Sequence, residues 1–458
     1  MLVICYGSRG VSIVDALTSS VGYKTKLFIV DKQRNPYNIK RSHDHVVIPD
    51  YDVKKITMYV NARRDDIDFG IVGPEKPIIN GIRDVVEKET KIPLLCPTKK
   101  YAIEASKVAQ RFLLEEVAPE VNPRFKVFDP KKYSNSSNVK EDLDQWLDEL
   151  NNQVVVKPDK PAAGKGVGVW GDHFNSRTEL LNDFLLNLKY GKVIVEEKLV
   201  GEESSFQAFC DGEHLVSLPE TRDYKRAFDG DKGPNTGGMG SYKDVGNVLP
   251  FMTDSDWERE IDVVTQIFHY LKGSKRNPEI IGVPLYVAFM HTASGPKVLE
   301  INSRPGDPEI MNILPNIKDD FVEVCLRMIE GSLTSINLED LATVVTYKVP
   351  PTYAGKHKTY SGSRLVNLQK AYDICESYDG KLRLYPGALE LTNGQIQVLS
   401  SRTVALVGIG DNIQVARQRS LEGIEAIEGG SLWYRRDIAS REHIKNSVIN
   451  MKSLRGIS

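Results

Sequence analysis

The sequence predicts a mixed α/β and α+β protein of several domains, and three patterns indicate this class. Short apolar runs alternate with polar or helical stretches up to about residue 97, longer apolar runs pair into hairpins in the middle of the chain, and short β-like runs follow from about residue 336. These patterns are typical of a parallel sheet flanked by helices, of an antiparallel sheet, and of a small β-rich module. At 458 residues the chain is long enough for roughly two to four domains. We expect domains over residues 1–100, 101–335 and 336–458.

Composition and charge exclude several classes of protein. The 60 lysines and arginines are balanced by 62 acidic residues, so no overall field attracts nucleic acid or an anionic membrane. No apolar run approaches the ~18 residues of a membrane span, and the first residues lack the charged segment of a signal peptide. Five scattered cysteines favour reduced core thiols. We expect a cytoplasmic monomer or homodimer that binds small molecules, with no nucleic acid and no membrane as partner.

The first hundred residues contain five strand-like runs, LVICYG, KLFIVD, HVVIP, FGIVGPE and IPLLC. Their alternation with helical stretches is typical of a Rossmann-type parallel sheet. The first run ends in Gly7-Ser8-Arg9-Gly10 and an acid, Asp31, follows the second, although a full G-x-G-x-x-G motif is missing. Three interpretations of the first loop stay open: a structural tight turn, a phosphate site at the start of the next helix, or a nicotinamide cofactor site.

The middle of the chain mixes helices, loops and hairpins. Apolar residues recur at helical spacing over residues 99–117 and 177–188. The polar segment KKYSNSSNVKED, residues 131–142, predicts a mobile loop, and KVIVEEKLVGEE predicts a strand. Hairpins are predicted in FQAFCDGEHLVSL, which turns at residues 211–212, and in YVAFMHTASGPKVLEINSR, which turns at residues 293–295.

A glycine- and lysine-rich loop joins two strand-like runs in VVVKPDKPAAGKGVGVW, residues 154–170. Small residues make such a loop flexible and expose many backbone N–H groups, so it can close over a polyphosphate. Lys157 stands beside the loop, where it can hold a phosphate as a fixed charge, whereas Lys165 would move with the loop. The alternative is a mobile hairpin with solvated lysines.

The segment LEINSRPGDPE, residues 299–309, carries candidate metal ligands. Glu300 and Asn302 are two apart on a predicted strand, so their oxygens share a face, and Mg²⁺ needs only one or two such ligands when phosphate oxygens complete its shell. Arg304 is predicted on the same face, where its planar fork can grip a carboxylate or an acyl phosphate. The alternative is an exposed strand face with an unrelated acid and amide. The Pro-Gly-Asp-Pro turn argues for fixed geometry.

Several segments together resemble a known family. The glycine-rich loop, EEKLVGEES, RDYKRAFDGDKGPNTGGMGSY and LEINSRPGDPE occur in the order found in the phosphoribosylamine–glycine ligase family, whose members are ATP-grasp enzymes also called glycinamide ribonucleotide synthetases. IVGPEKPIINGI, the Ser106-Lys107 pair and SLWYRRDIASR match as well, so the resemblance covers nearly the whole chain. It implies an N-terminal Rossmann-like domain, a central ATP-grasp domain and a small β-rich C-terminal domain.

The resemblance also implies an ATP-dependent ligase of purine biosynthesis. In such an enzyme ATP phosphorylates the carboxylate of glycine, and the amine of 5-phosphoribosylamine attacks the glycyl phosphate to give glycinamide ribonucleotide, ADP and phosphate. This chemistry depends on positioning and charge stabilisation and needs no covalent nucleophile. ATP and Mg²⁺, or Mn²⁺ in its place, are the implied cofactors.

The site residues follow from the matching motifs. Catalytic roles are expected for Lys157, Asp223 and Arg304, and metal binding for Glu300 and Asn302. The residues expected to bind ATP are Lys107, Lys157, Ala163, Gly164, Lys165, Gly166, Glu196, Glu197, Leu199 and Glu203. Those expected to bind the other substrates are Gly7, Arg9, Gly10, Gly73, Pro74, Glu75, Asp223, Lys225, Arg226, Asn235, Thr236, Gly237, Gly238, Arg304, Gly306 and Asp307. A solvated strand edge at residues 196–197 and a linker in GPNTGGMG stay open as alternatives.

Two departures from the family leave the second substrate open. The family's first loop resembles G-x-G-G-R-E-H-A-L, and Val11, Ser12 and Ile13 replace its Arg, Glu and His. Pro305 replaces the aromatic residue of R-F-G-D-P-E and stiffens the turn. We expect Arg9 to compensate as a phosphate ligand at a helix start. The alternatives are a ligase for a different amino acid and amine, or a nucleotide-binding protein without activity.

The last part of the chain turns to short β runs. ATVVTYKVPP, KLRLYPGALEL and IQVLSSRTVALVGIG are followed by a helical pattern over residues 412–425. We expect this module to pack on the ligase core, and the resemblance implies that it supplies a wall of the second-substrate pocket.

Overall fold

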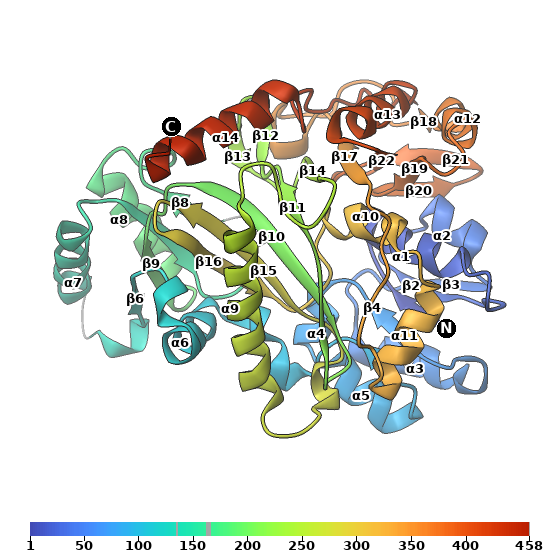
Figure 1. The fold of residues 1–458 in the computed structure, drawn as a ribbon, viewed down its shortest axis with the longest axis horizontal. Coiled ribbons are helices and arrows are strands. Elements are labelled where there is room, and N and C mark those ends of the chain that lie inside the picture. The colour runs from blue at the N-terminus through green and yellow to red at the C-terminus, as the bar shows by residue number, and fades with distance from the viewer. Residues whose placement is uncertain (134–135, 162–165, 458) are drawn as a thin grey trace.

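Three sheets organise the computed structural model, which describes residues 1–133, 136–161 and 166–457. Figure 1 shows a parallel sheet near the amino terminus at one end, a small antiparallel sheet with α7 and α8 at the other, and a large antiparallel sheet between them. The predicted fold class is confirmed. No helix in the described ranges is long and apolar enough to cross a membrane.

The amino-terminal sheet is parallel throughout, in the order β3-β2-β1-β4-β5. Its strands are β1 (Leu2–Ile4), β2 (Phe28–Asp31), β3 (Asp44–Val47), β4 (Gly70–Val72) and β5 (Leu94–Leu95). Its helices are α1 (Gly7–Thr18), α2 (Pro36–Arg41), α3 (Val53–Asn61), α4 (Glu75–Ile79) and α5 (Ile82–Thr90). Alternate residues of β1 point to opposite faces, so Val3 packs with α1 while Leu2 packs with α3 and α5.

The strand order creates a switch point between β1 and β4. The chain runs outward from β1 to β2 and β3, and then returns to place β4 on the other side of β1. Helices α1 and α4 therefore begin side by side at the carboxyl ends of neighbouring strands. Ligands of open α/β sheets bind at such a point.

The small sheet is antiparallel in the order β6-β9-β7-β8. Its strands are β6 (Phe125–Phe128), β7 (Val154–Pro158), β8 (Gly168–Val169) and β9 (Val193–Glu197). Helices α7 (Ser136–Glu149) and α8 (Arg177–Leu188) pack on it through a core that includes Phe128, Trp146 and Phe184. Helix α6 (Lys107–Val117) precedes this unit and packs instead against the large sheet.

The large sheet has eight strands in the order β16-β15-β10-β11-β14-β17-β22-β19. Residues 202–302 supply β10 (Glu202–Cys210), β11 (Leu215–Asp223), β14 (Gly240–Lys243), β15 (Gly282–Thr292) and β16 (Gly295–Asn302). The later part of the chain adds β17 (Ala342–Lys348), β19 (Leu382–Pro386) and β22 (Val404–Gly410). Both predicted hairpins are confirmed, since Cys210 pairs with Leu215 and Thr292 pairs with Gly295.

Helices and short hairpins surround the large sheet. The helices are α9 (Asp254–Lys272), α10 (Ile310–Ile313), α11 (Phe321–Glu330), α12 (Gln369–Ser377), α13 (Ile413–Glu425) and α14 (Arg441–Arg455). The remaining strand pairs are β12 (Arg226–Phe228) with β13 (Lys232–Asn235), β18 (Val366–Asn367) with β23 (Glu428–Gly429), and β20 (Leu389–Thr392) with β21 (Gln395–Val398). In Figure 1 the red helix α14 crosses above β10 and reaches toward the small sheet.

Three local predictions were wrong in detail. The helical pattern over residues 99–117 is two short 3-10 turns followed by α6, which begins only after Ser106. The Ser106 hydroxyl accepts from the N–H of Ala109 as the cap of α6 and donates to Oδ1 of Asp159 at 2.6 Å. The segment expected to be a loop contributes residues 136–142 to α7. KVIVEEKLVGEE is not one strand, since β9 ends at Glu197 and β10 begins at Glu202 in a different sheet.

Candidate active site

A buried ion triad joins α6, β7 and β9. The Arg111 guanidinium donates from Nε to Oε1 of Glu196 at 2.6 Å and from Nη2 to Oε2 at 3.0 Å, and Lys157 Nζ donates to the same Oε2 at 2.6 Å. Burial alone raises the pKa of Glu196, but Arg111 and Lys157 outweigh it and lower the pKa to about 2. Glu196 is therefore ionised and fully paired, and it fixes the position of Lys157.

Arg111 also ties this triad to the large sheet. Its Nη1 donates to the carbonyl of Val298 at 3.0 Å and its Nη2 to that of Leu299 at 2.6 Å. Lys157 Nζ lies 3.5 Å from the carbonyl of Leu299. The strand β7 that carries Lys157 and the strand β16 that carries Glu300 thus lie on the same side of the molecule.

Glu300 lies among three lysines from different parts of the chain. Burial raises its pKa, but the opposing effect of Lys225, Lys107, the Asn302 hydrogen bond and Lys157 is larger, so the net shift is downward. Asn302 donates its amide nitrogen to Oε1 of Glu300 at 3.3 Å, which leaves the amide oxygen outside this contact. The two predicted metal ligands are therefore adjacent, and positive charge surrounds them.

The other residues predicted to bind ATP are distributed around this centre. Glu197 accepts from the backbone N–H of Arg124 at 2.9 Å, and Leu199 lies in the turn that follows β9. Glu203 on β10 pairs with Nζ of Lys225 at 2.5 Å. Gly166 is exposed at the end of the glycine-rich loop. Ala163, Gly164 and Lys165 lie outside the described residues.

Asp223 forms the second centre of the site, at the end of β11. Burial raises its pKa well above the ordinary range, Glu309 adds to the rise, and Lys225 and Arg402 oppose it. Its Oδ1 atom is enclosed and has no hydrogen-bond partner among the described residues. A side chain at Gly238 would bring a Cβ within 2.5 Å of that atom, so glycine is required for the loop to pass this close.

The loop before Gly238 is fixed to the strand that carries Lys225. Thr236 donates from its backbone N–H to the Lys225 carbonyl at 2.7 Å, and its hydroxyl accepts from the N–H of Gly238 at 3.1 Å. Asn235 pairs with Arg226 across the β12–β13 hairpin. GPNTGGMG is therefore ordered and fixed beside Lys225, and the linker alternative is wrong.

The turn after β16 completes this end. Arg304 Nη2 pairs with Oε1 of Glu104 at 3.3 Å, and its guanidinium carbon lies 5.6 Å from the centre of the Tyr286 ring. Gly306 donates its N–H to Oε1 of Gln207 at 2.7 Å. Asp307 accepts from Nη2 of Arg402 at 2.7 Å.

The switch point between β1 and β4 adjoins this turn through Arg9. Arg9 Nη1 donates to the Pro305 carbonyl at 2.9 Å, and Nη2 lies 3.8 Å from Oε2 of Glu75 at the start of α4. Gly10 packs against Cys5, and Gly73 and Pro74 are buried beside Arg9, while Gly7 begins α1. All six residues predicted in the amino-terminal domain therefore lie together.

Arg226 and Asp31 are engaged with other parts of the protein and not with the candidate site. Arg226 pairs with Asp172 of the small-sheet unit at 2.5 Å and donates to the carbonyl of Gly233. Asp31 is fully buried and accepts from the Asn38 side chain at 2.7 Å. Asp31 is thus occupied inside the protein, which argues against the nicotinamide interpretation of the first loop.

Unpaired buried polar atoms gather around the turn. Within the described residues they include Nε of Arg9, Nε2 of Gln207, Oδ1 of Asp223 and Nε of Arg304. Leaving such atoms unpaired is costly, so a polar ligand that meets them is stabilised. They provide a structural reason to place a charged small molecule here.

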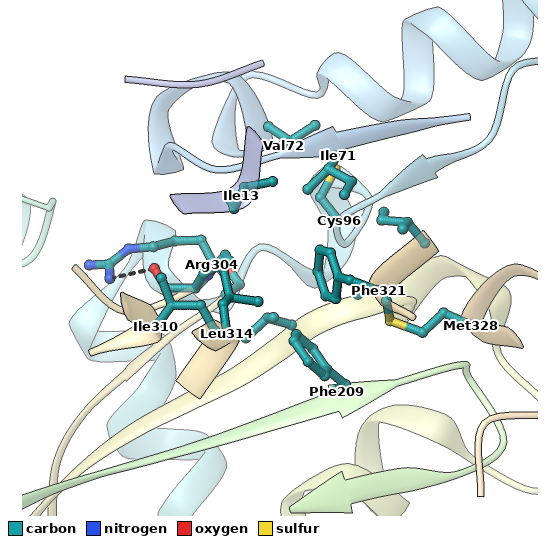
Figure 2. A pocket seen from close by; sticks show the side chains of 15 residues that line it. Ile13, Ile71, Val72, Cys96, Phe209, Arg304, Ile310, Leu314, Phe321 and Met328 are labelled. Carbon is teal, nitrogen blue, oxygen red and sulfur yellow. Dashed lines mark hydrogen bonds between the residues drawn. The ribbon is translucent and has the colours of Figure 1, made fainter. Parts of the chain in front are cut away.

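An apolar cavity lies behind Arg304. Figure 2 shows Ile13, Ile71 and Val72 on one side of it and Phe209, Ile310 and Phe321 on the other, with Arg304 at its edge. Its volume is about 30 Å³, enough for one small molecule the size of water and far below the roughly 300 Å³ of a ligand pocket. This cavity is a packing gap between the amino-terminal domain and the large sheet.

Sequence reasoning missed three residues that shape the site. Arg111 lies on a helical pattern of apolar residues, Tyr286 lies within an apolar strand, and Arg402 lies in a β-rich segment that carried no motif. Tyr286 donates to Oε1 of Glu309 at 2.5 Å. No local signal marks them, because each acts on partners far away in the chain.

Comparisons with known proteins identify the family of this chain. Family models for the N domain and the ATP-grasp (A) domain of phosphoribosylglycinamide synthetase match residues 1–104 and 124–310. The phosphoribosylamine–glycine ligase of Methanocella arvoryzae is 35% identical over 100% of both chains, and that of Pyrococcus furiosus is 33% identical over 100% of this chain and 98% of its own.

Solved structures share the fold. The phosphoribosylamine–glycine ligase of Thermotoga maritima matches with a TM-score of 0.73 at 23% identity, covering 95% of this chain and 99% of its own. The biotin carboxylase domain of the Hydrogenobacter thermophilus 2-oxoglutarate carboxylase matches with a TM-score of 0.67 at 13% identity, covering 98% and 93%. The family models and the full-length relatives together establish that the chain belongs to the phosphoribosylglycinamide synthetase, or phosphoribosylamine–glycine ligase, family.

Proposed function

We propose that this protein joins glycine to 5-phosphoribosylamine and converts ATP to ADP and phosphate. The observation that carries the proposal is the position of Lys157, which Glu196 fixes at 2.6 Å and which lies 3.5 Å from the Leu299 carbonyl, beside the Glu300–Asn302 pair. The chain that carries this arrangement is 35% identical over its full length to a phosphoribosylamine–glycine ligase. A fixed cation next to a carboxylate and an amide suits a polyphosphate and a divalent metal together. We extend the proposal to a cytoplasmic location.

Lys157 holds the nucleotide phosphates. Its partner Glu196 and the Arg111 anchor support this role, because they keep the ammonium group in one place while the strand β7 leads into the glycine-rich loop. A pre-positioned charge loses little entropy when the phosphate arrives. Lys107, at the start of α6, supplies further positive charge.

Glu300 and Asn302 fit Mg²⁺. A carboxylate and an amide on neighbouring positions of one strand face supply the one or two oxygen ligands that this ion needs when phosphates fill the rest of its shell. When bound, Mg²⁺ neutralises phosphate charge and polarises the phosphoryl group.

Asp223 and Arg304 bind the reacting acid and amine. Among the described residues neither Oδ1 of Asp223 nor Nε of Arg304 has a hydrogen-bond partner, so the first suits an ammonium group and the second suits a carboxylate. The γ-phosphoryl group of ATP passes to a glycine carboxylate oxygen and ADP leaves. The amine nitrogen then bonds to the carbonyl carbon, the carbon–oxygen bond to phosphate breaks, and the amine proton passes to solvent.

Arg9 and Glu75 contact the phosphoribosylamine. They stand at the starts of α1 and α4, at the switch point next to the Pro305 carbonyl. Val11, Ser12 and Ile13, which replace the family's Arg, Glu and His, are buried in α1. Their identities therefore act on packing, which gives no support to a different amine.

ADP release tests the proposal. The assay couples ADP formation to a spectrophotometric readout, generates phosphoribosylamine in place, and varies the amino acid. We expect release that requires glycine, the amine and Mg²⁺ together, and Glu300→Gln should lower it about a hundredfold or more. Glu258→Gln, which removes an exposed carboxylate on α9, is the matched control and should leave the rate unchanged. ADP release with other amino acids or amines only would reject the proposal.

A further inference from the structure

We propose that Arg402 is a positioning residue for the amino-acid end of the site. It lies just before β22, in the last part of the chain, and it joins the turn after β16 to the loop before β14. The inference rests on the proposed function and deepens it, because it assigns to the C-terminal part a specific effect on the acid and amine substrates.

The guanidinium of Arg402 contacts both loops at once. Nη2 pairs with Oδ2 of Asp307 at 2.7 Å, and Nη1 donates to the Asp307 carbonyl at 3.2 Å. The same Nη1 donates to the carbonyls of Gly237 and Gly238, the latter at 3.3 Å. One side chain therefore fixes the turn after β16 against the loop before β14.

Tyr347 locks this arrangement from the neighbouring strand. Its hydroxyl donates to Oδ1 of Asp307 at 3.1 Å, and the Arg402 guanidinium carbon lies 4.7 Å from the centre of its ring. Both carboxylate oxygens of Asp307 are thus held, Oδ1 by Tyr347 of β17 and Oδ2 by Arg402 of the segment that leads into β22. Arg402 and Asp307 side chains are only 15% and 13% exposed, so water offers little replacement for either contact.

The loop held by Arg402 is the loop that borders Asp223. At Gly238 a Cβ would meet Oδ1 of Asp223 at 2.5 Å and Cδ of Pro308 at 2.6 Å, so the backbone fills the space between the acid and the turn. Any shift of the Gly237 and Gly238 carbonyls therefore moves the wall against which a bound amino acid lies. Misplacement of about 1 Å can lower a reaction rate about a hundredfold.

A planar fork is required for this role. Nη1 and Nη2 point to different groups, a carboxylate oxygen and a set of carbonyls, and a single ammonium cannot meet both in the same geometry. Lysine should therefore restore the charge without restoring the alignment.

Steady-state kinetics with each substrate varied in turn test the inference. Arg402→Met should raise the Michaelis constants for glycine and the amine about tenfold to a hundredfold while that for ATP changes less than about twofold. The Michaelis constants of Arg402→Lys for glycine and the amine should lie between those of Arg402→Met and those of the wild type. Arg383→Met is the matched control, because Arg383 is also in the last part of the chain and pairs with Asp15 of α1 at 2.8 Å. It should lower the melting temperature and leave the Michaelis constants unchanged.

Each result has a defined meaning. If Arg402→Met raises the Michaelis constant for ATP as much as those for glycine and the amine, or lowers only the melting temperature as Arg383→Met does, the positioning role is rejected. If Arg402→Met does not fold, Arg402→Lys decides, and wild-type constants in that variant reject the role. A wild-type protein that shows no release dependent on glycine and the amine rejects the proposed function itself, and the inference with it.

Discussion

Glu196 and Asp223 are two enclosed carboxylates of the same site, and their surroundings drive their pKa values in opposite directions. Arg111 and Lys157 saturate both oxygens of Glu196 and lower its pKa to about 2. Burial and Glu309 raise the pKa of Asp223, and its Oδ1 has no partner in the described residues. The difference separates a carboxylate whose oxygens are both paired with protein cations from one that we propose binds a ligand.

The largest effect is expected from breaking the ion triad of Arg111, Glu196 and Lys157. Glu196→Gln leaves Arg111 and Lys157 buried without their counter-charge, which should lower the free energy of unfolding by about 3–5 kcal/mol. Urea denaturation measures the loss. Glu149→Gln is the control, because the Arg124–Glu149 pair is 54% exposed at both side chains and should cost about 1 kcal/mol or less. Equal losses in the two variants would show that the triad does not stabilise the fold.

Removing the charge of Asp223 should change the free energy of unfolding in the opposite direction. Asp223→Asn removes a carboxylate whose Oδ1 is buried and has no hydrogen-bond partner among the described residues, so near pH 5 the free energy of unfolding should stay the same or rise by about 1 kcal/mol. ADP release should fall about a hundredfold. Asp262→Asn, on the exposed side of α9, should change neither quantity. A variant that loses stability and keeps its activity would reverse the roles assigned to the two carboxylates.

The same contrast explains which parts of the site could be predicted from sequence. Glu300 and Asn302 are two apart on one strand, and Gly237 and Gly238 sit in a dense glycine motif, so local pattern was enough to name them. Lys157 could be named for the same reason. Its fixation could not, because Glu196 and Arg111 come from a strand and a helix 39 and 46 residues away.

The fold followed the same rule. Periodicity predicted the parallel sheet and both hairpins, since those elements repeat a short pattern. It extended α6 too far toward the amino terminus because the cap at Ser106 depends on Asp159, which lies 53 residues later. Arg402 shows the limit most clearly. Its partners, Asp307 and the Gly237 carbonyl, lie 95 and 165 residues earlier in the chain.

The smallest effect is a difference in how stability depends on pH. Glu196 has a folded pKa near 2 against an ordinary value of 4.5, so its contribution is present above about pH 4.5 and is lost as the pH falls toward 2. Asp223 has a folded pKa above its ordinary 3.8, so its contribution is present below that value and is lost as the pH rises through the folded pKa.

Urea midpoints measured from pH 4 to pH 8 should therefore separate the two variants. The stability advantage of Asp223→Asn over the wild type should grow as the pH rises, because the folded wild type resists ionisation of Asp223 while the unfolded chain does not. The deficit of Glu196→Gln should stay level above pH 5, because Glu196 is ionised in both states there. Saturating glycine should make the stability difference between Asp223→Asn and the wild type less dependent on pH, since an ammonium group beside Asp223 lowers its pKa in the wild type. A stability difference that does not change with pH in the absence of glycine would mean that a cation already pairs with Asp223 in the free protein.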